Sequence, residues 1–127
     1  MKKKTEIHIF ENGIYPIKIY VYINPTEESL KRDFCKHDMS DCAPYGDIGD
    51  TMICVCYSVV CNRANGEYGV LVSVFNRKLS VDTIAHEATH VANRVWNWIG
   101  EQEPSEEANA YLVGHAAKCI YNAIKNI

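Results

Sequence analysis

Residues 84–91, IAHEATHV, are of types that could hold a metal ion and activate water. His86 and His90 are four residues apart, so on an α-helix they lie one turn above each other on the same face. Two imidazole nitrogens could then bind one zinc ion, and Glu87, one residue round from His86, could take a proton from a water molecule. This H-E-x-x-H pattern predicts a zinc site that makes hydroxide available at neutral pH.

A catalytic zinc ion normally takes three protein ligands and leaves one position for water. Downstream, residues 104–115 read PSEEANAYLVGH and follow a loop at the start of another helix. Glu107, Tyr111 and His115 are spaced at i, i+4 and i+8, so they share one helical face. We expect Glu107 to be the third ligand, with Glu106 as the alternative. Tyr111 and His115 are candidates for stabilising an oxyanion.

The first half of the chain must supply strands to support that helix. Residues 5–10 resemble a short strand, and residues 17–23 alternate in hydrophobicity as a half-buried strand does. Asn24-Pro25 predicts a helix start, with Asn24 as the cap and the helix reaching about residue 36. Residues 38–50 carry dense turn chemistry and predict a mobile loop.

The second half predicts two more strands, at about 51–60 and 69–76, joined by a turn at Asn65-Gly66. The pattern then becomes helical. Ser80 is a plausible cap, Gly100 closes the first helix, and Ser105 can cap a last helix that runs towards residue 124. The predicted order is β-β-α-β-β-α-α, which is an α+β class.

Length and composition reduce the number of protein classes to which the chain could belong. A chain of 127 residues fits a single domain, and 47% hydrophobic with 23% charged residues is ordinary for a globular protein. A net charge of −3 provides no basic surface for nucleic acid. No apolar run is long enough for a membrane span, and none follows the lysines of residues 2–4 as in a secretory signal, so we expect a cytoplasmic protein.

The six cysteines predict reduced, mostly buried thiols rather than a disulfide framework, because no secretory signal is readable. A second metal site is conceivable from either of two sets (Cys35, His37 and Cys42, or Cys54, Cys56 and Cys61), but neither has the paired spacing of a structural zinc site. A thiol redox protein is disfavoured because no C-x-x-C opens a helix.

The pattern TIAHEATHVAN…EEANAYLVGH resembles the glutamate-zincins and, more narrowly, is similar to small metallopeptidases encoded by phages and prophages. The resemblance covers about residues 69–116. It implies a zincin-like fold, in which a small mixed, curved sheet with an edge strand at the cleft packs against the H-E-x-x-H helix and a C-terminal glutamate helix. It also implies zinc-dependent peptide hydrolysis, with His86, His90 and Glu107 as metal ligands and Glu87 as general base.

The sequence therefore predicts one zincin-like domain over residues 1–127, a zinc metallopeptidase whose partner is a peptide or protein substrate. We expect the strand at 69–76 to pair with an extended substrate by strand addition. The competing interpretation is a non-catalytic zinc-containing binding or regulatory protein of phage or bacterial origin. Glu87 favours catalysis, because a purely structural site does not need it.

Overall fold

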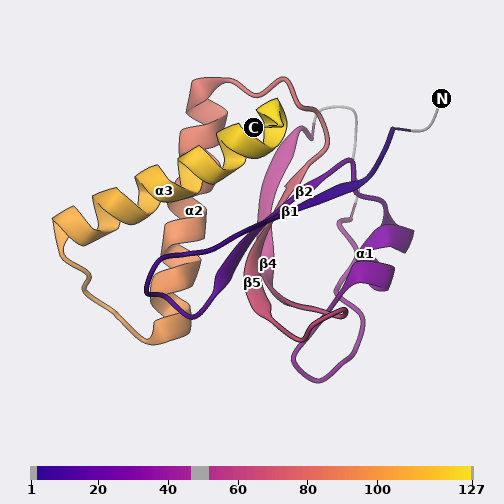
Figure 1. Cartoon of the computed structure of the whole chain (residues 1–127), viewed down its shortest axis with the longest axis horizontal. Coiled ribbons are helices and arrows are strands. Elements are labelled where there is room, and N and C mark those ends of the chain that lie inside the picture. Colours follow the sequence, from indigo (N-terminus) through magenta and orange to yellow (C-terminus); the bar gives the residue numbers. More distant parts are fainter. Residues whose placement is uncertain (1–2, 47–51, 127) are drawn as a thin grey trace.

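The computed structural model describes residues 3–46 and 52–126 and confirms the α+β class. Helices α2 and α3 cover one face of a five-stranded sheet, and α1 lies on the other (Figure 1). The order of elements is the predicted one with a two-residue strand, β3, added. The elements are β1 (Glu6–Phe10), β2 (Lys18–Ile23), α1 (Glu27–Asp33), β3 (Phe34–Cys35), β4 (Cys54–Asn62), β5 (Tyr68–Val74), α2 (Val81–Ile99) and α3 (Glu106–Lys125).

The sheet is mixed, with strand order β1-β2-β5-β4-β3. β5 pairs in parallel with β2 and antiparallel with β4, whereas the other pairs are antiparallel. β5 therefore has hydrogen-bonded neighbours on both sides. The prediction that residues 69–76 bind substrate by strand addition is wrong, because a central strand has no free edge to offer.

The alternation in β2 separates two cores rather than a core from solvent. Ile19 and Val21 pack with residues of α2 and α3, whereas Tyr20 and Tyr22 pack with Leu30 of α1 on the other face. The side chains of these four β2 residues are all fully buried. The prediction of a half-buried strand is wrong for this reason: α1 covers the face that carries the tyrosines.

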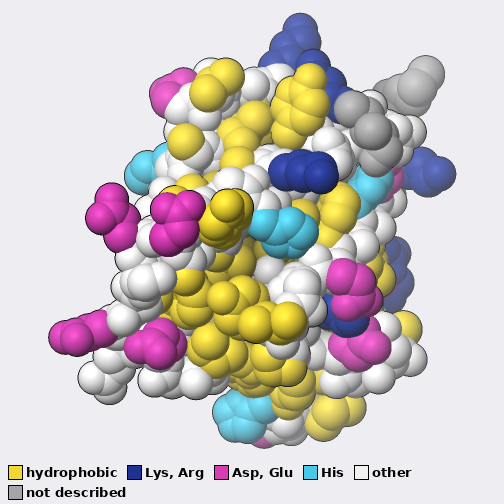
Figure 2. Space-filling model, turned by 60° about the vertical axis from the view of Figure 1, so that its left-hand side comes forward, with side chains coloured by type: hydrophobic (Ala, Val, Ile, Leu, Met, Phe, Trp, Pro, Cys, Tyr) yellow, Lys and Arg dark blue, Asp and Glu magenta, His cyan; other side chains and the backbone are white. Residues whose placement is uncertain are grey.

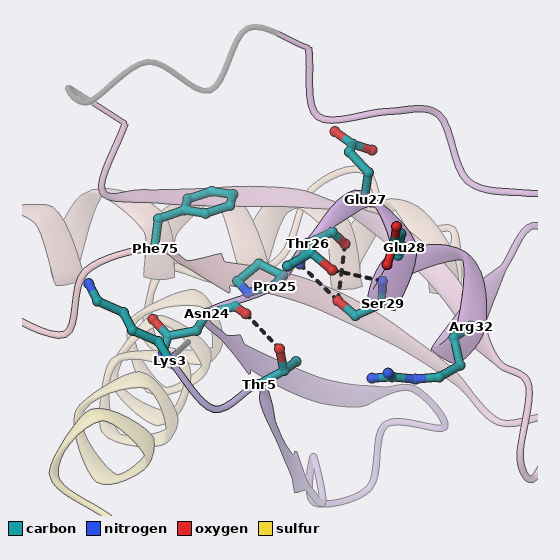
Figure 3. A pocket seen from close by; sticks show the side chains of 10 residues that line it. All are labelled: Lys3, Thr5, Asn24, Pro25, Thr26, Glu27, Glu28, Ser29, Arg32 and Phe75. Atoms are coloured by element: carbon teal, nitrogen blue, oxygen red, sulfur yellow. Dashed lines mark hydrogen bonds between the residues drawn. The ribbon is translucent and has the colours of Figure 1, made fainter. Parts of the chain in front are cut away.

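The start of α1 differs from the prediction by two residues (Figure 3). Thr26, not Asn24, is the N-cap: its hydroxyl accepts from Ser29 N at 3.0 Å, and Ser29 Oγ accepts from Thr26 N at 2.8 Å. Asn24 instead has a positive φ of 54° and continues the chain out of β2. The helix also ends at Asp33 rather than near residue 36, because Phe34 begins β3.

The two long helices begin and end close to the predicted residues. Ser80 is the N-cap of α2, and Gly100 ends that helix in the left-handed region, at φ 79°. Ser105 caps α3 by accepting from Ala108 N at 3.1 Å. Of the predicted loop at 38–50, residues 47–50 lie outside the described residues. The rest contains no helix and a single isolated bridge, between Cys35 and Asp41.

The cysteines are as predicted: all six are free, and all but the partly exposed Cys54 are buried. No helix in the described part of the chain combines the length and the apolar character needed to cross a bilayer.

Candidate metal centre

The two histidines of α2 come together on its surface. His86 Nε2 and His90 Nε2 are 3.2 Å apart, and the rings meet edge to face with centroids separated by 4.8 Å. Two ligands at about 2.0–2.1 Å from one ion, at the tetrahedral angle, are about 3.3–3.4 Å apart. The pair therefore already has the separation of two zinc ligands, and the exposed His86 leaves the site open to solvent.

Glu87 is buried beside this pair, with 7% of its surface exposed. Its Oε2 accepts a hydrogen bond of 2.6 Å from the backbone N–H of Cys56 in β4, and its Oε1 lies 4.0 Å from His86 Nε2. One carboxylate oxygen is thus anchored to the sheet while the other faces a metal-ligand candidate. Such an anchor fixes the orientation of a proton acceptor.

β4 makes the anchor possible because its first half lies at the sheet edge. Its register against β5 shifts between Cys56 and Ser58, which marks a β-bulge. In the described ranges, β4 pairs with β3 only through Cys61 and Asn62. The N–H of Cys56 can therefore donate to Glu87 instead of to a neighbouring strand.

Cysteine thiolates do not join the histidines. Burial, together with the nearby Glu87 carboxylate, raises the pKa of Cys54 to about 12. Burial likewise raises the pKa of Cys56 to about 12. Neither of the two conceivable cysteine sets is assembled, since residues 3–46 and 52–126 hold no group of three or more His, Cys, Asp or Glu suited to a metal.

Glu107 is likewise not brought to the histidine pair. It is exposed in the first turn of α3, as is Glu106. Asn109, half a turn further on, accepts a 2.9 Å hydrogen bond from Trp96 Nε1, so this end of α3 lies beside Trp96. Trp96 is six residues beyond His90, a rise of about 9 Å along α2. Figure 1 shows the beginning of α3 projecting away from the sheet.

Tyr111 and His115 face a different neighbour, the loop between β1 and β2. Tyr111 is 73% exposed, and His115 Nε2 lies 2.9 Å from the carbonyl oxygen of Glu11, to which it donates. Both line a cavity with no wall residue from α2. Spacing correctly put Glu107, Tyr111 and His115 on one helical face, but it contained no information on what that face meets.

The sequence analysis did not identify Arg94 as a candidate site residue, although it is four residues after His90 on the same helix. It lines a shallow pocket of about 250 Å³ together with Ser58, Val59, Asn97 and Trp98. Ser58 and Val59 continue β4 beyond Cys56, the residue whose N–H donates to Glu87. A cavity of about 710 Å³ lies beside α1 instead, and its wall includes neither histidine nor cysteine (Figure 3).

Comparison of the chain with protein-family models, with curated proteins and with solved structures gave no match.

Proposed function

We propose that His86 and His90 bind a zinc ion and that the chain is a zinc-dependent metallopeptidase. The observation that carries the proposal is the 3.2 Å separation of the two Nε2 atoms beside an anchored, buried glutamate. The described residues support two protein ligands for the ion. They do not support Glu107 as a third ligand, so we assign the ion to the histidines alone.

Zinc, when bound, supplies a Lewis acid that polarises a carbonyl and lowers the pKa of a water molecule. The chain itself supplies the proton transfer. Glu87 is held through Oε2, so Oε1 is free to take the proton of the attacking water and to return it to the leaving amine. Because the first half of β4 lies at the edge of the sheet, an extended substrate would pair with that half of β4, rather than with β5.

The test combines zinc content with hydrolysis of a fluorogenic peptide mixture by the wild type and by Glu87→Gln. We expect one zinc per chain in both proteins, and hydrolysis by the wild type alone, because the amide cannot accept the proton. A variant that still cleaves peptides would overturn the role of Glu87. Zinc-loaded wild type that cleaves nothing in the mixture would favour the alternative below.

The alternative is a non-catalytic zinc-binding protein, and one observation favours it: no third ligand is gathered within the described residues. In that case zinc would stabilise α2 without turnover. Glu87→Gln would then change neither zinc content nor any measured activity.

A further inference from the structure

Arg94 is a partly buried cation whose guanidinium forms no ion pair with the residues that the structure describes. Each of the other three arginines pairs with a carboxylate: Arg32 with Asp33, Arg63 with Asp41 and Arg77 with Glu6. A guanidinium carries a fixed positive charge and a planar fork of N–H donors that matches a carboxylate. Arg94 is therefore the arginine that is free to bind such a group from outside the chain.

The pocket of about 250 Å³ beside Arg94 has room for a single side chain or a chain end. Arg94 is the only charged residue among the described residues of its wall, and the Ser58 hydroxyl and Asn97 amide are neutral polar groups. The Trp98 ring is packed against Tyr68 of β5, with centroids 5.0 Å apart. An exposed ring alone would not distinguish this pocket, because hydrophobic side chains cover a broad area of the face shown in Figure 2. Its distinguishing feature is the unpaired positive charge.

The pocket lies further along α2 and β4 than the proposed metal centre. Arg94 follows His90 by four residues, so it lies on the same side of α2 and about 6 Å further along the axis. On β4, Ser58 follows Cys56 by two residues, which is about 7 Å along a strand. Burial raises the pKa of Cys56 and the charge of Arg94 opposes that increase, which agrees with a guanidinium near this strand. The two elements thus advance together from the metal centre to the pocket.

We propose that Arg94 binds a carboxylate of a peptide held between α2 and the first half of β4. The proposal rests on the proposed function in one respect, namely that a peptide occupies this groove. An extended peptide advances about 3.3 Å per residue, so the rise from His90 to Arg94 corresponds to about two residues. The carboxylate would therefore lie about two residues from the scissile bond. Its source is either the C-terminus of a short peptide or an Asp or Glu side chain, since both present two oxygens to the guanidinium.

The test measures peptide binding by the full chain without zinc, so the readout does not depend on turnover. The probes are acetylated tetra-alanine with a free C-terminus, its C-terminal amide, and two such amides in which one alanine is replaced by Glu or by Gln. Backbone amide shifts should saturate around residues 58–59 and 94–98. At least one carboxylate probe should bind about tenfold more tightly than its neutral counterpart, the scale of a hydrogen bond to a charged group.

Three variants show whether that preference belongs to Arg94. Arg94→Met should abolish it, and Arg94→Lys should keep part of it, because an ammonium retains the charge but not the planar fork. Lys118→Met removes the charge of an exposed residue of α3 that lines a different cavity, so this control should keep the full preference.

The carboxylate probe that binds more tightly identifies the source of the group. Absence of saturable shifts, equal binding of charged and neutral probes, or a preference that persists in Arg94→Met would overturn the proposal, even if the zinc-loaded chain cleaves peptides. Failure of the proposed function would give a different result: the preference for a carboxylate would depend on Arg94, but the zinc-loaded wild type would cleave no peptide. The pocket would then be part of a peptide-binding groove without catalysis.

Discussion

The metal ligands can be tested one residue at a time. His86→Ala and His90→Ala should each lose zinc measured by elemental analysis after identical purification, because each removes one of two nitrogens already 3.2 Å apart. Glu107→Ala should keep the wild-type zinc content, because Glu107 is exposed on the first turn of α3 beside Trp96. Loss of zinc from Glu107→Ala would show that α3 moves to complete the site, and would restore the ligand set implied by the sequence resemblance.

Two glycines offer a second residue-scale test. A Cβ built on Gly69 would lie 2.3 Å from Tyr20 Cε2, and that ring cannot yield because it is fully buried and its hydroxyl donates to Glu67 O at 2.8 Å. Gly69→Ala should therefore lower the free energy of unfolding by about 1–3 kcal/mol, the range for overpacked cores. Urea unfolding measures this change in the free energy of unfolding.

Gly114 is the matched control for Gly69. It lies within α3, and a Cβ there would meet nothing within 4 Å. Gly114→Ala should raise stability by about 0.5–1 kcal/mol, because alanine loses less backbone entropy in a helix than glycine does. Equal effects at the two positions would contradict the packing of Tyr20 on the β5 backbone.

Among the elements, the helix starts differ in how they are capped. Ser105 accepts a hydrogen bond from Ala108 N, whereas the side chain of Ser80 makes no cap bond to the backbone and pairs with Thr83 Oγ1 instead. Ser105→Ala should cost about 1 kcal/mol of stability, and Ser80→Ala clearly less. Thermal unfolding of the two variants side by side would reveal the difference, and a larger loss at Ser80 would refute it.

Periodicity predicted the elements well because strand and helix periods are local properties of the chain. It located β2, β5 and α2 and the capping of α3 by Ser105. It erred on Tyr20 and Tyr22, whose burial depends on α1, an element that arrives later in the chain. The prediction that residues 69–76 bind substrate failed for a similar reason. Alternation does not encode the order of strands in a sheet, so it could not reveal that β5 is a central strand.

The candidate site, too, could be predicted from the sequence only where its geometry is local. His86, Glu87 and His90 belong to one helix, so their mutual geometry followed from 3.6 residues per turn. The positions of Glu107, Tyr111 and His115 relative to them depend on how α3 crosses α2, which spacing cannot specify. The bond from Cys56 N to Glu87 arises from long-range packing and had no sequence signal.

For the whole molecule, one ion pair connects distant parts of the chain. The Arg77 guanidinium pairs with Glu6 of β1 and also donates to Ile124 O at the end of α3, at 3.0 Å. Hydrogen bonding from Arg77 lowers the pKa of Glu6 below its ordinary value of 4.5. A lowered pKa stabilises the folded state above the unfolded pKa, and this contribution is lost as pH falls through the folded pKa.

Stability should therefore decline as pH falls below about 4.5, and Arg77→Met should flatten that decline. Lys78→Met removes the same charge from the exposed neighbouring residue and is the control. Denaturant unfolding at several pH values between neutral and acidic would measure both slopes. Identical slopes in the two variants would show that the Arg77 pair contributes nothing specific.

The central place of β5 also constrains how the chain can be assembled. β2 ends at Ile23, but its parallel neighbour is not complete until Val74, so the middle of the sheet joins segments about fifty residues apart. During synthesis the apolar faces of the β1–β2 hairpin and α1 therefore remain exposed to solvent until β5 has emerged from the ribosome. Closure of that long loop delays the first stable nucleus. A nascent chain halted before Val74 would therefore be the form most in need of a chaperone.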